Sequence, residues 1–365
     1  METEFHIEIE TIDSGADSGN SARTGGSVSE TEGQACCTVL PKTAPPEPYD
    51  AAFIAQFQEQ VEKTISDHHL FTKKSKVLVA ASGGKDSTAL LHVLKNLGYT
   101  IEAVTVDARI GCYTEENLKN LRQFCQKINI ALHEIDFRNE FGMALCHIRD
   151  RLHANGYDYK SCHVCGVLRR YLINKKAKEL GPDCIATGHN LDDESQVIMM
   201  NLLRSNVECA ARLGPKSGLG DDVRFVQRVK PFYFTREVDV VRYAKMMELP
   251  VKYGMCPCSS DSYRREIRNI FSIVPNAEQA KENIMKAFMG ILPRLKAHYG
   301  AQEKTLRECI ACSEPTNNEL CNACSLLQKI EKVDNKIDNK DKEKAENTKQ
   351  IETTAPYEQL IVLTP

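Results

Sequence analysis

The sequence contains no long apolar run, and no segment approaches the roughly 18 residues that a membrane-spanning helix needs. It also lacks a targeting leader. The first stretch, METEFHIEIETID, is acidic and has no basic segment followed by an apolar one, which a secretory or mitochondrial signal requires. These absences argue against a membrane or exported protein, so we expect no membrane contact and a cytoplasmic location.

The chain has little net charge, −3 over 365 residues, but the sign is unevenly distributed. Residues 1–50 hold many acids and only two bases, Arg23 and Lys42, so the remainder is mildly basic. A basic body permits a nucleic-acid partner. Residues 1–48, rich in Gly, Ser, Thr and acids, cannot bury a core and are predicted to be disordered. Residues 329–365 begin with balanced charges and are predicted to form a charged tail.

Short apolar segments alternate with helical patterns along residues 49–300, which we expect to form one ATP-binding and catalytic domain. Apolar strands that alternate with helices predict an α/β fold, a doubly wound parallel sheet with helices on both faces. Ligands bind such sheets beyond the carboxyl ends of the strands. The predicted strands are 76–81, 101–106, 131–135, 183–187 and, more weakly, 225–231. The predicted helices start with one from Asp50 and continue near 87–97, 114–128, 138–154, 165–180, 192–204, 235–248 and 276–298.

The common phosphate loop, G-x-x-x-x-G-K-S/T, is missing after the first predicted strand. A different glycine-bearing loop takes its place. Its two glycines permit a sharp turn and a close approach to a ligand, and the helix that follows offers free N–H groups and one lysine. The pattern predicts a phosphate site, and a tight strand–helix turn is the alternative. The loop consists of Ser82, Gly83, Gly84, Lys85, Asp86 and Ser87.

This loop, S-G-G-x-D-S after the first strand, resembles the signature of the pyrophosphate-loop ATPases. The resemblance implies that ATP is cleaved between its α- and β-phosphates, that the loop holds the departing pyrophosphate, and that AMP is transferred to a substrate oxygen. Asp107, at the end of the second strand, occupies the position at which this family contacts adenosine. An ordinary acid in a turn is the alternative.

Fifteen cysteines in a reducing compartment favour metal or redox chemistry over disulfides. Cys162 and Cys165 form a C-x-x-C pair before a predicted helix, where two thiolates can bind one metal or form a redox pair. A structural zinc site is the alternative. Cys256 or Cys258, in MCPCSS, supplies the candidate for a third thiol.

A group of acids opens the helix that follows the fourth strand. Asp192, Asp193 and Glu194 come directly after Gly188-His189-Asn190-Leu191. Acids at a helix start favour the helix dipole on their own. They also suit Mg²⁺, which binds through one or two carboxylates together with phosphate oxygens.

The C-terminal part of the chain contains two tight cysteine pairs in CIACSEPTNNELCNAC. Two C-x-x-C pairs separated by eight residues predict a closed tetrahedral Zn²⁺ site, and we assign residues 301–328 to a zinc ribbon. Neighbouring lysines and arginines permit contact with RNA phosphates. The four predicted ligands are Cys309, Cys312, Cys321 and Cys324.

Taken in order, SGGKDS, CHVCG-x-x-RR, TGHNLDD, VKPF and the CP…SYRREIR segment resemble the tRNA 2-thiouridine synthetases of the TtuA type, over about residues 50–328. The resemblance implies a 4Fe–4S cluster on Cys162, Cys165 and Cys256, with one open iron for sulfide. It implies that a uridine oxygen is adenylated and that sulfur then displaces AMP. In this family Asp193 matches a catalytic acid, and Arg169 falls where a basic side chain is expected. The residues of the loop, together with Gly188, His189 and Asp192, are expected to bind ATP.

The same resemblance implies tRNA as substrate and a ubiquitin-like carrier with a C-terminal thiocarboxylate as sulfur donor, and it leaves a homodimer open. The sequence departs from this family in two places. The first fifty residues carry only Cys36-Cys37 where relatives have an N-terminal ribbon, and Cys258 is extra.

The alternative functions are another adenylating enzyme, of the lysidine or amidotransferase type, and a non-catalytic zinc and RNA-binding protein. A persulfide route without a cluster is the alternative mechanism.

Overall fold

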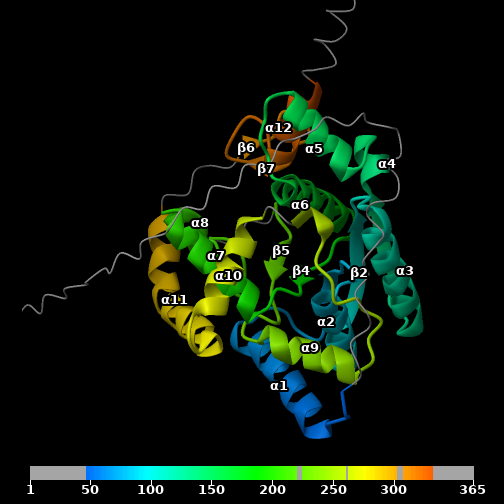
Figure 1. The fold of residues 1–365 in the computed structure, drawn as a ribbon, viewed down its shortest axis with the longest axis vertical. Helices are drawn as coiled ribbons and strands as arrows, with labels where there is room; N and C mark the ends of the chain where they lie inside the picture. The colour runs from blue at the N-terminus through cyan, green and yellow to red at the C-terminus, as the bar shows by residue number, and fades with distance from the viewer. Residues whose placement is uncertain (1–46, 220–223, 260–261, 302–306, 332–365) are drawn as a thin grey trace, which may run out of the picture. The chain divides into compact units, whose positions relative to one another are not determined.

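Five parallel strands form the central sheet (Figure 1). The computed structural model describes residues 47–219, 224–259, 262–301 and 307–331. Every predicted strand is present: β1 (Lys76–Ala80), β2 (Thr100–Asp107), β3 (Leu132–Asp136), β4 (Cys184–Thr187) and β5 (Gln227–Val229). Their order across the sheet is β3-β2-β1-β4-β5, and each neighbouring pair is parallel.

Side chains of the first strand alternate between two hydrophobic cores. Val77 and Val79 are buried in one core, and Leu78 is buried in the other. Because successive side chains of a strand point to opposite faces of the sheet, both faces must be covered by apolar side chains. The three central residues of KVLVA are therefore all apolar and buried, and the predicted doubly wound α/β fold is confirmed.

Helices from distant parts of the chain cover the two faces. The core around Val77 is completed by α1 (Ala51–Asp67), α2 (Lys85–Asn96), α3 (Gly111–Lys127) and α9 (Glu237–Met246). The core around Leu78 is completed by α4 (Phe137–Phe141), α5 (Leu145–Ala154), α6 (Ser161–Leu180) and α12 (Asn322–Glu331). The first helix starts where the sequence predicts, because the Asp50 carboxylate accepts the Phe53 N–H at 3.0 Å and caps it.

A third apolar cluster joins the helices drawn in green and yellow on one side of the sheet in Figure 1. Leu191 and Ile198 of α7 (Leu191–Leu203) pack with Phe288 of α11 (Ala277–Gly300). The short helix α8 (Val207–Ala211) and helix α10 (Tyr263–Ile273) pack beside them. The remaining elements are η1 (Pro257–Ser259) and the ribbon strands β6 (Arg307–Glu308) and β7 (Pro315–Thr316).

Two helix predictions differ from the structure. The segment 138–154 is two helices, because Gly142 adopts a left-handed conformation with φ of 72° and ends α4. Helix α6 begins at Ser161 and not at 165, so both cysteines of the C-x-x-C pair lie in its first two turns. The sequence patterns also left α8, α10 and α12 unpredicted. In α10 only Ile267 and Phe271 are buried, which is too short an apolar pattern to identify a helix.

Several predictions concern residues that the structure does not describe. The predicted disordered segment 1–48 and charged tail 329–365 lie outside the described residues except for 47–48 and 329–331. The division between the 49–300 domain and the 301–328 ribbon stays a prediction. Among the described helices, none has both the length and the apolar character needed to cross a membrane.

Candidate functional site

The predicted phosphate loop connects β1 to α2. Gly83 has φ of 77°, and a Cβ atom added there would lie 2.5 Å from the backbone oxygen of Asn117. Glycine is therefore required by both conformation and space. Gly84 precedes α2 and offers no side chain to cap it. The first N–H groups of α2 remain available to an anionic ligand, as a phosphate cradle requires.

Helix α2 begins at Lys85, two residues earlier than predicted, so the loop lysine and aspartate lie in its first turn. Lys85 forms ion pairs at 2.8 Å with Asp86 and with Glu237. Burial alone would lower the pKa of Lys85, but these two carboxylates outweigh it and raise the pKa. Burial also raises the pKa of Asp86, with Asp193 and Glu237 adding to it against Lys85. Acids crowded in this way suit a bound cation.

The end of β4 is held tightly against this loop. A Cβ atom at Gly188 would lie 2.9 Å from the backbone carbon of Asp86, so glycine is needed for the close approach. Asn190 joins the two segments: its side-chain oxygen accepts the Asp193 N–H at 3.0 Å, and its amide donates to Asp86 Oδ1 at 3.0 Å. This one side chain caps α7 and sets Asp86 in position.

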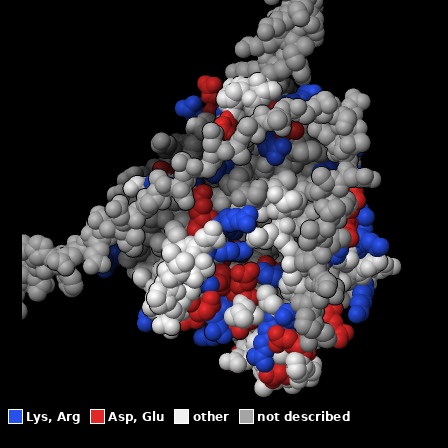
Figure 2. All heavy atoms as spheres, viewed as in Figure 1, with Lys and Arg blue, Asp and Glu red and all other residues white. Residues whose placement is uncertain are grey.

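The acids at the start of α7 have different surroundings. Asp192 is buried and accepts the Glu237 N–H at 2.7 Å and a hydrogen bond from Lys281. The charge of Asp193 raises the pKa of Asp86, and Arg264 of α10 donates to Asp193 at 3.2 Å. Figure 2 shows Lys and Arg side chains intermixed with Asp and Glu near the middle of this face.

Two further predicted residues, His189 and Asp107, make hydrogen-bond contacts of the kind found in ordinary turns. Desolvation lowers the pKa of His189, although its side chain is exposed to solvent. Its Nδ1 lies 2.9 Å from Thr187 Oγ1. Asp107 accepts the Arg109 N–H at 2.7 Å and also lines the pocket described next.

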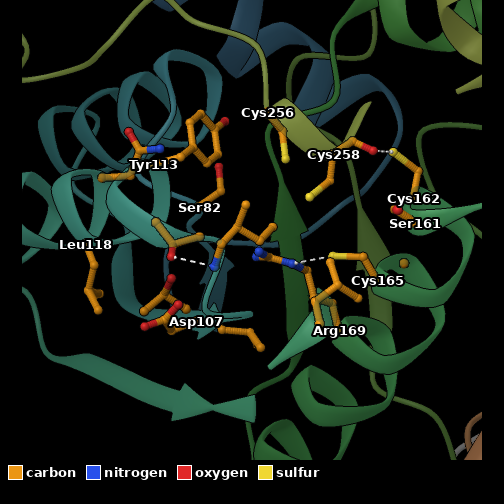
Figure 3. Close-up of a pocket in the computed structure, with 17 residues that line it drawn as sticks. Ser82, Asp107, Tyr113, Leu118, Ser161, Cys162, Cys165, Arg169, Cys256 and Cys258 are labelled. Atoms are coloured by element: carbon orange, nitrogen blue, oxygen red, sulfur yellow. Dashed lines mark hydrogen bonds between the residues drawn. The ribbon is translucent and has the colours of Figure 1, made fainter. Parts of the chain in front are cut away.

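A pocket of about 300 Å³ lies between the phosphate loop, α3, α6 and the segment that precedes α10 (Figure 3). It brings together residues that are distant in the sequence. Ser82 of the loop and Asp107 of β2 line one side, and cysteines line the other. The predicted cysteines, Cys162, Cys165 and Cys256, all line it, with the extra Cys258 and with Arg169.

The pocket cysteines are placed by two elements. Cys162 and Cys165, three residues apart, share one face of the α6 N-terminus, where helices favour negative charge. Arg169, one turn further, donates from Nε to Cys165 Sγ at 3.2 Å. The thiol and backbone of Cys258 donate to Cys256 and lower its pKa, against burial, which raises it. Three thiols on one wall, one favoured as thiolate, fit the donor set of a three-cysteine iron–sulfur cluster.

The four ribbon cysteines form a closed group. The Sγ atoms of Cys309, Cys312, Cys321 and Cys324 lie within 4.8 Å of one another, and in the described residues no other set of three or more potential metal-ligating side chains is so compact. The sulfurs of Cys312 and Cys321 are 3.7 Å apart. Tetrahedral ligands on Zn–S bonds of about 2.3 Å stand about 3.8 Å apart, so this spacing fits zinc. Backbone N–H groups, led by that of Cys321, outweigh burial and lower the pKa of Cys309 to about 6.

The comparison with known proteins agrees with this geometry. A family model described as a PP-loop domain matches residues 53–251. The chain is 30% identical to the tRNA-5-methyluridine(54) 2-sulfurtransferase of Pyrococcus horikoshii over 296 residues, which cover 80% of this chain and 91% of that protein. The chain belongs to the tRNA-thiolating branch of the PP-loop family.

Two further similarities, one to a protein sequence and one to a solved structure, support this assignment. The Cytoplasmic tRNA 2-thiolation protein 1 of Drosophila yakuba is 31% identical over 283 residues, covering 76% of this chain and 80% of that protein. The solved structure of the U34-tRNA thiolase NcsA from Methanococcus maripaludis, with its 4Fe–4S cluster, aligns with a TM-score of 0.63 and 28% identity. That alignment covers 75% of this chain and 87% of the NcsA chain. The predicted family is thereby confirmed.

Sequence patterns alone missed some residues of this PP-loop site. Glu237 pairs with Lys85, 152 residues away in the sequence, and Arg264 pairs with Asp193, 71 residues away. Tyr113 lines the pocket, and burial raises its pKa. No local signal marks these three, because only the fold brings them to the site. Asn190 could have been found, since an asparagine before a helical run is a capping signal.

Proposed function

We propose that the chain is an ATP-dependent tRNA 2-sulfurtransferase, which adenylates the carbon-2 carbonyl oxygen of a uridine and replaces that oxygen with sulfur. One observation carries the proposal: a single pocket joins Ser82 of the phosphate loop to Cys162, Cys165 and Cys256. Adenylation and sulfur attack occur at the same carbonyl group. The two sets of residues must therefore open onto one space.

The ATP half of the proposed site consists of the loop and the acids around it. The N–H groups at the start of α2 and the Lys85 ammonium hold the pyrophosphate that leaves when the uridine oxygen attacks the α-phosphorus. Asp86 and Asp193 hold Mg²⁺ between the phosphates, and Asp107 meets the adenosine. Asn190 positions Asp86 through its 3.0 Å hydrogen bond.

The sulfur half consists of the pocket cysteines and Arg169. Cys162, Cys165 and Cys256 would hold a 4Fe–4S cluster, which when bound supplies one iron without a protein ligand, and hence a position for incoming sulfur. Arg169 holds Cys165 through its 3.2 Å contact and adds positive charge beside the thiols. The AMP leaving group departs with its negative charge toward the loop side, where the cationic Lys85 lies.

The proposed partners follow from the relatives' names and from the chemistry. A tRNA uridine is the substrate, and the named relatives act at positions 54 and 34. A ubiquitin-like carrier with a C-terminal thiocarboxylate supplies sulfur as sulfide. A cytoplasmic location agrees with the name of the Drosophila relative. The ribbon cysteines hold structural Zn²⁺.

The first experiment identifies the product of ATP. With an unmodified tRNA transcript and a sulfide source, the wild-type protein is expected to release AMP and pyrophosphate, and Lys85→Ala to release neither while its circular dichroism stays unchanged. Among the described residues the Lys85 ammonium forms ion pairs with Asp86 and with Glu237 of α9, and neither belongs to a hydrophobic core, so its loss should leave the core packing intact. Release of ADP by the wild type would refute the proposal. Mass spectrometry of the tRNA nucleosides then tests for 2-thiouridine and locates it.

A further inference from the structure

A second, larger pocket lies on the opposite side of α6 from the cysteine pocket. Its volume is about 580 Å³, and we call it the ribbon pocket because the C-terminal ribbon forms one wall. The other walls come from α6, α8 and the chain next to β5. Its polar lining includes Arg170 and Asn174 of α6, Arg212, Arg228 and ribbon residues Thr316 and Asn318.

The acids that line the ribbon pocket already have cationic partners. Glu208 pairs with Arg212 at 2.7 Å, within one turn of chain. Glu314, which is buried, pairs with Lys178 at 2.7 Å. Neither carboxylate forms an ion pair with the two other arginines of the lining, although the charge of Glu314 still acts on Arg228.

Those two arginines, Arg170 and Arg228, form no salt bridge with any residue that the structure describes. Arg228 donates from Nη2 to Asn174 Oδ1 at 2.7 Å and to the Arg170 carbonyl oxygen at 3.2 Å, so its guanidinium is fixed by neutral groups. Burial is the main cause that lowers the pKa of Arg228 to about 10; the charge of Arg170 acts in the same direction, and that of Glu314 acts against it. Burial also lowers the pKa of Arg170, although that side chain still reaches solvent.

Arg170 and Arg228 lie in one concave pocket without an ion-pair partner among the described residues, so their like charges repel each other. An anion with several oxygens relieves this arrangement. Guanidinium groups bind phosphate through paired N–H donors, and arginine is the side chain best suited to such contacts. Asparagine and threonine side chains on the ribbon wall add neutral donors for sugar and phosphate oxygens.

We propose that the ribbon pocket binds a backbone phosphate of the tRNA through Arg170 and Arg228. This proposal rests on the tRNA substrate proposed above. Arg169 lines the cysteine pocket and its neighbour Arg170 lines the ribbon pocket, so the two sites flank one helix. A helix is about 10 Å across with its side chains, which a polynucleotide spans within a few nucleotides. A uridine can thus enter the cysteine pocket while a flanking phosphate is held beside the ribbon.

The test measures the affinity of an unmodified tRNA transcript across a salt series. Arg170→Gln is expected to weaken binding several-fold and to reduce the slope of log K against log salt by about 1, the change for one lost phosphate contact. The KM for tRNA should rise more than kcat falls. Arg138→Gln is the matched control, an exposed arginine of α4 away from both pockets, and it should match the wild type.

Arg228→Lys provides a second variant, because it retains charge but loses the paired donors; it should weaken binding with less change in slope. Unchanged affinity and slope in Arg170→Gln would overturn the inference. The inference would also be overturned if Arg170→Gln lost only the stabilisation that inorganic phosphate gives the wild type. That result would assign the pocket to a free anion. If the wild type makes no 2-thiouridine but Arg170→Gln still binds tRNA less tightly, the proposed function fails and this inference stands.

Discussion

The protein holds two sets of cysteines with contrasting surroundings, which suit the two different tasks proposed for them. The ribbon set is four thiols in one closed group, with two sulfurs only 3.7 Å apart and backbone N–H groups directed at them. The pocket set is Cys162, Cys165 and Cys256, which line a space of about 300 Å³ together with Cys258 and with Ser82 of the phosphate loop. The first set is shaped for one small ion with no free position, and the second leaves room for a larger group and a substrate.

The same C-x-x-C spacing thus occurs in both sets, and context separates them. In the ribbon, two such pairs face each other across a short two-stranded turn, so four ligands meet at one point. In the pocket, one pair on α6 faces Cys256 from a distant segment, with Arg169 beside it. A closed site stabilises a fold, whereas an open site next to a nucleotide loop carries out chemistry.

The largest expected effect separates Cys256 from Cys258. Cys256→Ser should reduce tRNA thiolation to background, because it removes one of three proposed ligands, while Cys258→Ser should retain it. The measurement is 2-thiouridine formed per protein, by nucleoside mass spectrometry. Equal losses in both variants would mean that Cys258 is a fourth ligand and the pocket set is closed.

The second-largest effect is expected when one cysteine of the zinc ribbon is removed. Cys309→Ser should release zinc and lower the free energy of unfolding by several kcal/mol, since structural zinc binds small domains with on the order of 10 kcal/mol. The variant's folded fraction should still form AMP, because the ribbon is separate from the phosphate loop. Zinc content and urea denaturation test this. A full zinc complement in Cys309→Ser would contradict the assignment.

A smaller effect is expected at Arg169. Arg169→Gln removes the donor that lies 3.2 Å from Cys165 Sγ. Partners that orient metal ligands typically contribute about 10- to 100-fold to affinity or activity. Thiolation should fall within that range, whereas AMP formation from ATP should fall less. Arg138→Gln serves again as control, and wild-type thiolation in Arg169→Gln would show that the pocket thiols need no such support.

The smallest effect concerns the contact between the ribbon and α6. Lys178 pairs with Glu314 at 2.7 Å, with the lysine side chain 38% exposed. Exposed ion pairs contribute about 0–1 kcal/mol, and this pair should lie at the upper end of that range because Glu314 is buried. Lys178→Gln should therefore lower the free energy of unfolding by less than about 1 kcal/mol and leave the zinc content unchanged. A larger loss, or a loss of zinc, would mean that the ribbon depends on this contact for its own fold.

The sequence alone predicted the parts of the site that are local. SGGKDS lies between a strand and a helix, and both C-x-x-C patterns can be read from spacing. Their surroundings depend on tertiary contacts. Glu237 reaches Lys85 because α9 packs against α2, and Arg264 reaches Asp193 because α10 packs against α7. The pairing of Arg170 with Arg228 was equally hidden, because each arginine alone resembles a solvated surface residue.

The most direct test of the account is the metal content of protein prepared without oxygen. The wild type should contain iron, acid-labile sulfide and zinc, with a brown colour. Cys256→Ser should lose the iron and keep the zinc, and Cys309→Ser should lose the zinc and keep the iron. A colourless wild type that carries zinc at Cys162, Cys165 and Cys256 and still makes 2-thiouridine would contradict the account and favour a cysteine persulfide as the sulfur carrier.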